Sequence, residues 1–359
     1  MSNHVKRILI TGGAGFIGSN CLRYLLKNDS YQLLNIDLLT YAGNYSTIEN
    51  FENNERYSFS KGDIADSDFL EIQINEFMPD YIINFAAESH VDRSISSPYP
   101  FIRSNILGTY HLLEQSLSYL QGKGREKLDH FRFLHVSTDE VFGSLEKDQF
   151  FTELSRYDPS SPYSASKASS DHLVRSWNRT FNLPTLITNC SNNFGPYQFP
   201  EKLIPLAILH ALNNRPIPIY GKGDQVRDWL YVDDHVDAIE TVLIKGEVGQ
   251  TYNIGANNPC TNISIVEYIC KILDKLKPRV DGSSYNTLIN FVDDRPGHDN
   301  RYAIDSSKIE RELGWTSKYS FEESMQKTIQ WYMDNLEWCD EVSSETYDMS
   351  RLGLIKKGL

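Results

Sequence analysis

A glycine-rich turn near the start of the chain constrains the fold more than any other feature. The stretch "RILITGGAGFIGSNCLRYLL" places Gly12, Gly15 and Gly18 between an apolar run typical of a strand and an amphipathic run typical of a helix. Glycine lets the backbone approach a bound pyrophosphate, and N–H groups at a helix N-terminus attract its charge. Because a strand precedes the turn and a helix follows it, the sequence predicts a dinucleotide-binding turn, with Phe16 and Ile17 among the cofactor-binding residues.

Strand-like and helix-like segments alternate through the first half of the chain. Amphipathic, helix-length segments separate six short apolar runs, at residues 7–11, 31–37, 56–64, 80–87, 131–138 and 184–190. This alternation predicts an α/β fold, a Rossmann-type doubly wound parallel sheet with helices on both faces. Ligands of such sheets bind at the carboxyl ends of the strands.

The second half of the chain is less regular. Segments such as "NNFGPYQFPEKLIP" and "NNRPIPIYGKGDQVRDWLYVDD" are dense in Pro, Gly and Asn, with aromatic residues between them. They are typical of ordered binding loops, because linkers lack such apolar residues. We therefore expect a smaller C-terminal substrate-binding lobe. The predicted division is a dinucleotide-binding domain at 1–190 with a return of the chain at about 230–258, the lobe at 191–229 and 259–340, and a tail at 341–359.

Composition argues against several classes of partner. The 359 residues carry a formal net charge of −13 without a Lys/Arg-rich block, which disfavours non-specific binding to nucleic acid. Five scattered cysteines without a Cys-x-x-Cys pair are typical of a reduced, intracellular protein. The first apolar run is too short for a signal peptide, and none reaches the roughly 18 residues of a membrane helix. We expect a cytoplasmic protein that binds a small molecule, and neither a membrane nor a metal.

An acidic residue follows the glycine-rich turn where the ribose of a dinucleotide would lie. Asp37 closes the second apolar run, and a carboxylate there accepts hydrogen bonds from ribose hydroxyls and repels a 2′-phosphate. NAD is therefore favoured over NADP, although Asp37 could also be a turn or helix-cap residue. Asp63 and Ile64 end the third run, in a position suited to the adenine, and the small Ala86 and Ala87 end the fourth, where the cofactor would lie close.

A tyrosine and a lysine lie four residues apart in "SPYSASKASSDHLVRSW", so on a helix Tyr163 and Lys167 share a face. Tyrosine has an unperturbed pKa of about 10, which must fall by about three for it to act as a base near neutral pH. A lysine ammonium and an oxidised nicotinamide several ångströms away would supply energy of that order. The pair suits removal of a proton from an alcohol, although this spacing also occurs by chance on many helices.

Two adjacent carboxyl groups follow the fifth apolar run, in "VSTDEVFG". Such pairs are commonly solvated loop charges, but Asp139 and Glu140 come at the carboxyl end of a predicted strand. Because like charges repel, a site that brings both near a ligand makes it harder to ionise both, so one can serve as acid and the other as base. Adjacent residues of a strand point to opposite faces, so both reach one ligand only if the strand ends at Thr138.

Several of these motifs resemble those of a known family. "TGGAGFIG", "YSASK" and the strand-end Ser and Thr of "VSTDEVFG" are similar to the extended short-chain dehydrogenase/reductase family that modifies nucleotide sugars, from Arg7 to about Trp331. More narrowly, "FAAESHVDRSI", "STDEVFG", "NCSNNFGPYQFPEKLIPL" and "DDRPGHDNRYAID" resemble its 4,6-dehydratase members. The resemblance implies that the chain holds NAD and converts dTDP-glucose into dTDP-4-keto-6-deoxy-glucose, with no net change in NAD.

The resemblance also implies roles for the catalytic candidates. Tyr163 would remove the C4 hydroxyl proton while hydride passes to NAD, with Thr138 hydrogen-bonding the same oxygen and Lys167 holding Tyr163 and the nicotinamide ribose. Glu140 would then remove the C5 proton, which the C4 ketone makes acidic. Asp139, held protonated, would donate to the departing C6 hydroxyl, after which hydride returns to C6 and a proton to C5.

The remaining expected contacts divide between cofactor and substrate. For NAD the resemblance adds Ser104 and Asn193. A nucleotide diphosphate brings negative charge to an acidic protein, so local cations must hold it, and arginine suits bidentate phosphate contact. The implied substrate contacts are Arg227 and Arg295 on the diphosphate side, Pro218 and Tyr220 around the base, and Ser89, Asn192, Lys202, Leu203, Asn262 and His298 along the rest of the pocket.

Two other functions stay open. An NAD-dependent nucleotide-sugar 4-epimerase also needs Thr138, Tyr163 and Lys167, but it has no use for an acid/base pair beside C5 and C6. A non-catalytic dinucleotide-binding sensor could share the fold and dispense with the catalytic groups. The acidic pair therefore favours dehydration.

The resemblance further implies a homodimer, formed through the helix expected at 101–120 and the helix that carries Tyr163. The apolar residues of the first helix could equally belong to the intramolecular core; they are Ile106, Tyr110, Leu113 and Leu117.

Overall fold

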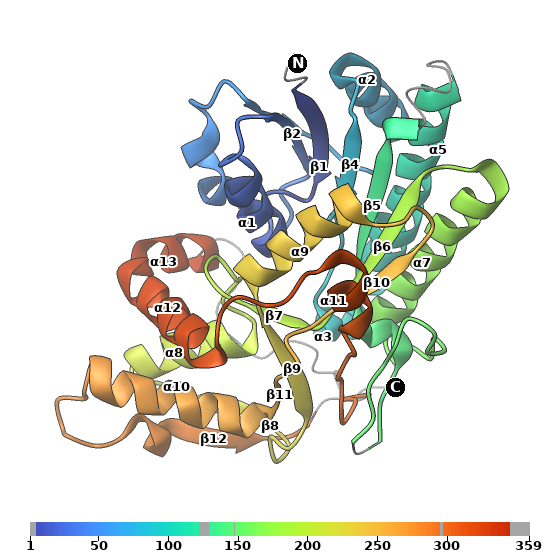
Figure 1. Cartoon of the computed structure of the whole chain (residues 1–359). Helices are drawn as coiled ribbons and strands as arrows, with labels where there is room; N and C mark the ends of the chain where they lie inside the picture. Colours follow the sequence, from blue (N-terminus) through green and yellow to red (C-terminus); the bar gives the residue numbers. More distant parts are fainter. Residues whose placement is uncertain (1–4, 122–128, 147, 295–296, 345–359) are drawn as a thin grey trace.

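A seven-stranded sheet runs through the centre of the structure, a computed structural model that describes residues 5–121, 129–146, 148–294 and 297–344 (Figure 1). Its strand order is β3-β2-β1-β4-β5-β6-β10, and all neighbouring strands are parallel. The strands are β1 (Lys6–Thr11), β2 (Tyr31–Asp37), β3 (Tyr57–Lys61), β4 (Tyr81–Asn84), β5 (Arg132–Thr138), β6 (Thr185–Cys190) and β10 (Thr251–Ile254). The predicted α/β, Rossmann-type fold is confirmed.

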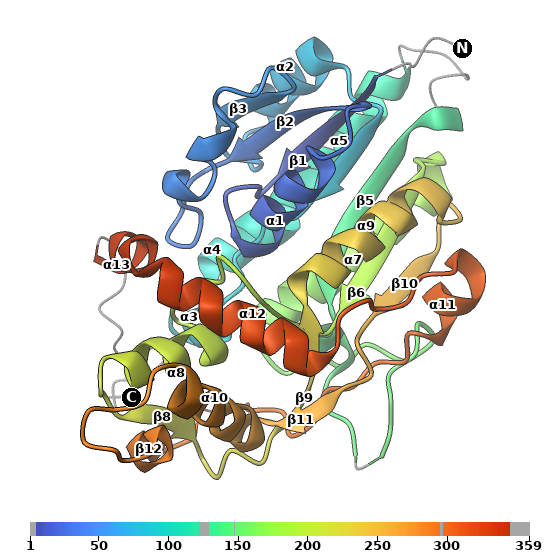
Figure 2. The same ribbon diagram turned by 60° about the vertical axis from the view of Figure 1, so that its left-hand side comes forward.

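Helices cover both faces of this sheet (Figures 1 and 2). On one face α1 (Phe16–Leu25) packs against α9 (Val232–Lys245), and on the other α5 (Thr109–Gln121) packs between α2 (Ser67–Phe77) and α7 (Pro162–Phe181). Successive residues of a strand point to opposite faces, so β1 contributes to two apolar layers. Ile8 and Ile10 pack in the layer of α1 and α9, and Leu9 packs in the layer of α2, α5 and α7.

The strand order reverses at β1, which lies between β2 and β4. Chain crossings on either side of this point leave a crevice at the carboxyl ends of the strands, where doubly wound sheets bind ligands. Short helical segments follow β4 at this edge and lead into α5. They are α3 (Val91–Ser96), α4 (Tyr99–Phe101) and the π-helical η3 (Ile102–Gly108).

A smaller lobe lies beyond the carboxyl ends of the main strands, in the lower part of Figure 2. It holds one sheet of order β11-β9-β7 and a second, parallel pair of β12 and β8. The strands are β7 (Asn192–Phe194), β8 (Ile217–Tyr220), β9 (Val226–Tyr231), β11 (Pro259–Thr261) and β12 (Ile289–Val292). The helices are α8 (Leu203–Leu212), α10 (Asn262–Leu276), α12 (Phe321–Asp334) and α13 (Leu336–Ser344).

The chain passes between the two parts more than once. After β9 it returns to the main sheet through α9 and β10, and α11 (Ser307–Leu313) packs against those two elements. The domain boundaries expected from the sequence stay a prediction. Short 3-10 helices also occur in the described part of the chain, namely η1 (Tyr45–Thr47), η2 (Glu49–Phe51), η4 (Asp139–Phe142) and η5 (Tyr285–Leu288). Among the described residues, no helix has the length and apolar character to cross a membrane.

Candidate active site

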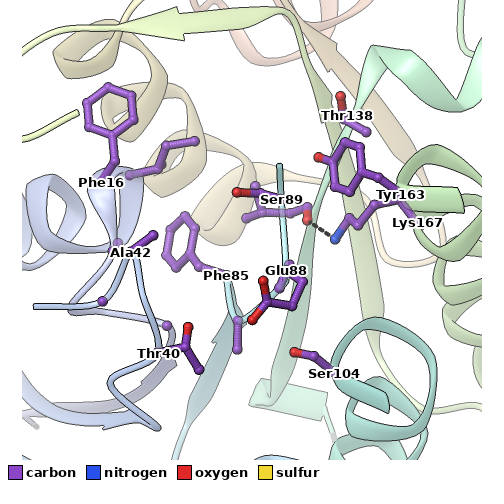
Figure 3. A pocket seen from close by; sticks show the side chains of 18 of the residues that line it. Phe16, Thr40, Ala42, Phe85, Glu88, Ser89, Ser104, Thr138, Tyr163 and Lys167 are labelled. Atoms are coloured by element: carbon purple, nitrogen blue, oxygen red, sulfur yellow. Dashed lines mark hydrogen bonds between the residues drawn. The ribbon is translucent and has the colours of Figure 1, made fainter. Parts of the chain in front are cut away.

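One cavity of about 480 Å³ opens at the carboxyl ends of β1, β2, β4, β5 and β6 (Figure 3). Its volume lies in the range of small-molecule sites, about 300–1,000 Å³. The loop that precedes α8 forms part of its wall on the side of the smaller lobe. The cavity therefore lies at the switch point of the sheet, between the two parts of the molecule.

The glycine-rich turn forms one end of the cavity. Gly12 has a φ of +73°, and a Cβ there would lie 2.6 Å from the backbone nitrogen of Ala86 at the end of β4. A Cβ on Gly18 would lie 2.2 Å from the carbonyl oxygen of Gly12, so both positions require glycine. Gly15 is the N-cap of α1, and because glycine has no side chain, no side-chain cap occupies the first N–H groups of the helix. The first N–H groups of α1 thus have the surroundings that a pyrophosphate requires.

The second cofactor element is Asp37, the last residue of β2. Its two carboxylate oxygens accept hydrogen bonds from the backbone N–H groups of Ala14 (2.9 Å) and Leu39 (2.8 Å). Burial raises the pKa of Asp37, and these two hydrogen bonds oppose the increase. Asp37 also lines the cavity, and a carboxylate oxygen that accepts one hydrogen bond can accept another from a ribose hydroxyl. The donor set fits NAD, since the same carboxylate would repel a 2′-phosphate.

An ion pair lies at the end of the cavity where the sequence predicts the adenine. Asp63 accepts a hydrogen bond from the backbone N–H of Ala65 (2.7 Å) and pairs with Arg103 on η3. Both residues line the cavity beside Ile64. The sequence analysis missed Arg103, because one arginine in an amphipathic segment carries no signal of its own.

The acidic pair lies at the end of β5. The strand ends at Thr138 and the 3-10 helix η4 begins at Asp139, so the predicted strand end is confirmed. The hydroxyl oxygen of Thr138 accepts a hydrogen bond from the N–H of Glu140 (3.3 Å) and caps this turn. Asp139 is 2% exposed, and its Oδ2 atom has no hydrogen-bond partner among the described residues. Glu140 is half-buried.

The two carboxyl groups of the pair differ in burial, and burial changes the ionisation of Asp139. It raises the pKa of Asp139 well above its ordinary value, and the charge of Glu140 adds to the increase, whereas Arg227 opposes it. The sequence analysis attributed unequal ionisation to repulsion within the pair. Burial is the larger cause, and the sequence could not show it because it depends on how η4 packs.

Tyr163 and Lys167 occupy the first turns of α7, which Ser161 and Ser164 cap reciprocally. Both side chains are buried and line the cavity, with Thr138 beside the ring of Tyr163 (Figure 3). The Nζ atom of Lys167 donates to the carbonyl oxygen of Val136 (2.8 Å). Burial lowers the pKa of Lys167 to about 8.

The pKa of Tyr163 differs from the expectation. Burial raises it well above its ordinary value, the charge of Glu140 adds to this, and a hydrogen bond with Thr138 opposes it. Lys167 was expected to lower this pKa, but burial outweighs any such effect among the protein's own groups. When NAD is bound, the positive charge of an oxidised nicotinamide would oppose the effect of burial on the pKa of Tyr163.

The cavity brings together most of the predicted residues and leaves others aside. Its walls include every predicted catalytic and cofactor residue, and also Ser89, Asn192 and Lys202. Arg295 lies outside the described residues. Six predicted substrate residues lie elsewhere in the structure, and they are Leu203, Pro218, Tyr220, Arg227, Asn262 and His298.

Several of these six residues have other partners. Arg227 is 5% exposed and donates to the carbonyl oxygens of Val226 (2.8 Å) and Asp299 (2.9 Å). The hydroxyl of Tyr220 lies 3.2 Å from Asp92, and its ring meets that of His298 edge-on. Leu203 and Asn262 begin α8 and α10, and Pro218 lies in β8.

The sequence analysis missed a second group of polar residues, of which Glu201 and Tyr41 line the cavity and His90 and Arg93 contact them from outside its lining. Glu201 is buried, and its Oε2 atom lies 3.6 Å from both His90 and Arg93. The guanidinium of Arg93 stacks over the ring of Tyr41, with 3.8 Å from Cζ to the ring centre. Glu201 and Tyr41 come from distant loops, and single loop residues have no periodic pattern that predicts their meeting.

This fold and cavity define an enzyme of the nucleotide-sugar-modifying type, with an NAD site at one end and a Tyr/Lys and carboxyl set at the other. The family model described as GDP-mannose 4,6 dehydratase matches residues 9–328, and the chain belongs to this family. It is 52% identical over 350 residues to dTDP-glucose 4,6-dehydratase of Salmonella typhimurium, a match that covers 95% of this chain and 96% of that protein.

Solved structures agree with this relationship. The dTDP-glucose 4,6-dehydratase of Bacillus anthracis, in complex with NAD, has a TM-score of 0.83 and 44% sequence identity, over 94% of this chain and 99% of that one. DesIV, the dTDP-glucose 4,6-dehydratase of Streptomyces venezuelae with NAD and TYD bound, has a TM-score of 0.85 and 40% identity over the same shares.

Proposed function

We infer that this chain is an NAD-dependent dTDP-glucose 4,6-dehydratase that forms dTDP-4-keto-6-deoxy-glucose. The similarity to dTDP-glucose 4,6-dehydratases over nearly the whole chain carries this conclusion. The geometry supports it, because the carboxyl groups of Asp139 and Glu140 share one cavity with Tyr163 and Lys167. Bound NAD supplies a hydride acceptor for C4 of the sugar and a hydride donor for C6.

The first part of the reaction falls to α7 and the end of β5. Tyr163 takes the proton of the C4 hydroxyl at its phenolic oxygen, and Thr138 hydrogen-bonds the same sugar oxygen. The ammonium of Lys167, held by the carbonyl of Val136, orients the nicotinamide ribose and stabilises the phenolate. The cavity buries all three groups, so their interactions with the sugar act in a water-poor site where electrostatic interactions are stronger.

Elimination of water falls to the acidic pair. A C4 ketone acidifies the C5 proton, and Glu140, the more exposed of the two, takes this proton as general base. Asp139 is fully buried with a raised pKa, so it holds the proton that the departing C6 hydroxyl needs. Acid and base thus differ because their surroundings differ. A 4-epimerase needs no such pair, and a non-catalytic sensor needs none of these groups.

Residues of the cavity wall and of the smaller lobe supply the proposed contacts to the substrate. Lys202 and Ser89 line the cavity, and the Nζ atom of Lys202 lies 3.4 Å from the carbonyl oxygen of Ser89. Arg227 lies over the ring of Tyr302, and its charge opposes the increase in the pKa of Asp139. We keep the diphosphate role of Arg227 and the base-binding roles of Pro218 and Tyr220 as proposals.

A mass spectrum of the sugar nucleotide tests the function. Purified protein with dTDP-glucose and a little NAD should yield a product lighter by one water, with no net NADH. An unchanged mass with a new chromatographic peak would indicate an epimerase. If the mass is unchanged and no new chromatographic peak appears, the protein acts on a different sugar nucleotide or only binds its ligand. UDP-glucose and CDP-glucose in parallel reactions measure the preference for the base.

We further propose that two chains form a homodimer, in the cytoplasm, through the outer face of η3, α5 and α7. Leu113 is fully buried in the core and Leu117 packs against it, so they are intramolecular. Tyr110 remains 36% exposed, and its ring contacts Trp177, which in turn contacts Phe181. These side chains, with the exposed Ile102 and Leu107, form an apolar face that supports the proposal.

A further inference from the structure

A buried carboxyl group lies behind the catalytic edge of the cavity and takes no part in the steps above. Asp171 follows Lys167 by one turn of α7 and is fully buried. Its Oδ2 atom accepts three hydrogen bonds, from the hydroxyl of Tyr157 (2.7 Å), the hydroxyl of Ser137 (3.0 Å) and the side-chain amide of Asn189 (3.3 Å). Burial raises the pKa of Asp171, and the charge of Lys167, the hydrogen bonds from Tyr157 and Ser137 and the charge of Arg175 oppose this increase and favour the ionised form.

The other oxygen of Asp171 faces a buried histidine. His135 Nε2 lies 3.5 Å from Asp171 Oδ1. The hydroxyl of Thr11 donates to Oδ1 of Asn84 (2.7 Å), so the amide nitrogen of Asn84 is the atom 3.1 Å from His135 Nδ1. Because an amide nitrogen only donates, Nδ1 accepts and the imidazole proton resides on Nε2, which lies near Oδ1 of Asp171 without a hydrogen bond to it. Burial lowers the pKa of His135, so the ring is neutral.

The position of the imidazole proton decides which group can compensate the positive charge of Lys167. The Nζ atom of Lys167 lies 3.4 Å from His135 Nε2, but a nitrogen that carries a proton cannot accept a hydrogen bond. Val136 supplies a carbonyl acceptor and no negative charge. Asp171 acts on Lys167 through its charge, which opposes the effect of burial on the pKa of Lys167, and Cys190 acts in the same direction.

The same carboxyl group joins the two elements that carry the catalytic residues. Ser137 belongs to the end of β5 and Asn189 to β6, and Asn189 also donates to the carbonyl oxygen of Thr138 (3.0 Å). Asp171 thus ties α7, with Tyr163, to the backbone just before the acidic pair. A shift of α7 along β5 would break these hydrogen bonds.

We propose that Asp171 is a positioning residue: its buried negative charge keeps the ammonium of Lys167 charged, and its hydrogen bonds hold α7 against the end of β5. The consequence for turnover rests on the proposed function, in which Lys167 acts as a cation. The consequence for the ionisation of Lys167 does not.

The substitution Asp171→Asn removes the negative charge of the side chain and keeps its shape. Carbon-13 labelling of the lysine Cε atoms, with Lys167 assigned through Lys167→Arg, follows ionisation by NMR. We expect the pKa of Lys167 to be lower in Asp171→Asn than in the unsubstituted protein. At a pH above the pKa of Lys167, each unit by which this pKa decreases leaves about a tenth as much of the ammonium form. At such pH values kcat should therefore fall about tenfold per unit, with KM little changed.

A matched variant separates charge from stability. Asp80→Asn removes another buried carboxylate, one that accepts from the backbone N–H of Arg7 (2.9 Å) far from the cavity. It should lower the melting temperature and leave the pKa of Lys167 and the pH profile unchanged. If Asp171→Asn behaves in the same way, Asp171 is a structural residue only and the proposal is wrong.

The unsubstituted protein gives a test that does not depend on how a variant folds. With aspartate labelled at Cγ, Asp171 should be ionised throughout the pH range in which Lys167 titrates. A protonated Asp171 in that range would overturn the proposal. If the titrations agree with it and the protein does not dehydrate dTDP-glucose, the proposed function fails and the charge pairing stands.

Discussion

At the residue scale, two neighbouring carboxyl groups have different surroundings. Asp139 is buried against apolar and charged neighbours, whereas Glu140 remains half-buried at the cavity wall. A proton donor and a proton acceptor can therefore coexist one residue apart. The raised pKa of Asp139 has a pH consequence: the acid is present below that pKa, so elimination should fail as pH rises through it.

Glu140→Gln removes the proposed base and keeps the size of the side chain. We expect C4 oxidation to continue and elimination to fall by about 10²–10⁴-fold, the usual contribution of a general base. Enzyme-bound NADH, followed by its near-ultraviolet absorbance, should accumulate with substrate. Glu322→Gln, an exposed residue in the first turn of α12, is the control and should turn over normally. Normal turnover of Glu140→Gln would exclude its role as base.

Tyr163→Phe should act one step earlier. Without the phenolic oxygen the C4 proton has no acceptor, so hydride transfer should fall by about 10²–10⁴-fold and no NADH should appear. Tyr285→Phe is the matched control, because its hydroxyl donates to the carbonyl oxygen of Lys277 (2.8 Å) in the smaller lobe. NADH formation at the normal rate in Tyr163→Phe would exclude Tyr163 as the base.

At the element scale, the turn between β1 and α1 combines a left-handed residue with a close backbone contact. A Cβ added to Gly12 would meet the backbone of Ala86, and the left-handed conformation costs a residue with a Cβ about 1–2 kcal/mol. We expect Gly12→Ala to weaken NAD binding in calorimetry and to lower the melting temperature. Gly282→Ala has the same sign of φ and open space around it, so it should lower stability and leave NAD binding unchanged.

The sequence could predict the parts of the site that follow from strand ends. Gly12, Asp37, Asp63, Ala86 and Thr138 each lie at or just after the end of an apolar run, and parallel strands bring such positions to one edge. The structure places all of them in one cavity. Because neighbouring strands of the sheet are parallel, residues at the carboxyl ends of separate strands lie together at one edge.

Other parts of the site could not be predicted in this way. Asp171 lies in the same sequence segment as Tyr163 and Lys167, yet its burial depends on how α7 packs against β5 and β6. Glu201, Arg93 and Tyr41 meet because separate segments converge, and loops have no periodicity that fixes their path. The raised pKa of Tyr163 results from the same packing, since burial is its first cause.

At the scale of the whole molecule, an acidic chain handles an anionic substrate. The formal net charge is −13, so attraction depends on local cations such as Lys202 in the cavity rather than on the overall field. The smaller lobe faces the carboxyl edge of the main sheet, and this lysine precedes α8 on that side of the cavity (Figure 2). Binding of the two ligands thus involves both parts of the chain.

The proposed dimer gives a prediction at the same scale. Light scattering coupled to size exclusion should report twice the mass of the 359-residue chain, and Leu107→Glu on the apolar face should reduce it to one chain. Leu276→Glu, on a similarly exposed leucine at the end of α10, should leave the dimer intact. A single-chain mass for the unsubstituted protein would exclude this interface.

The most direct test of the whole account follows one atom. With dTDP-glucose deuterated at C4 and NAD present, mass spectrometry and NMR should show a product that has lost one water and carries the deuterium at C6. That result requires C4 oxidation, elimination across C5 and C6, and hydride return within one cavity. Deuterium that remains at C4 in a sugar of unchanged mass, or that is lost to solvent, would contradict the account.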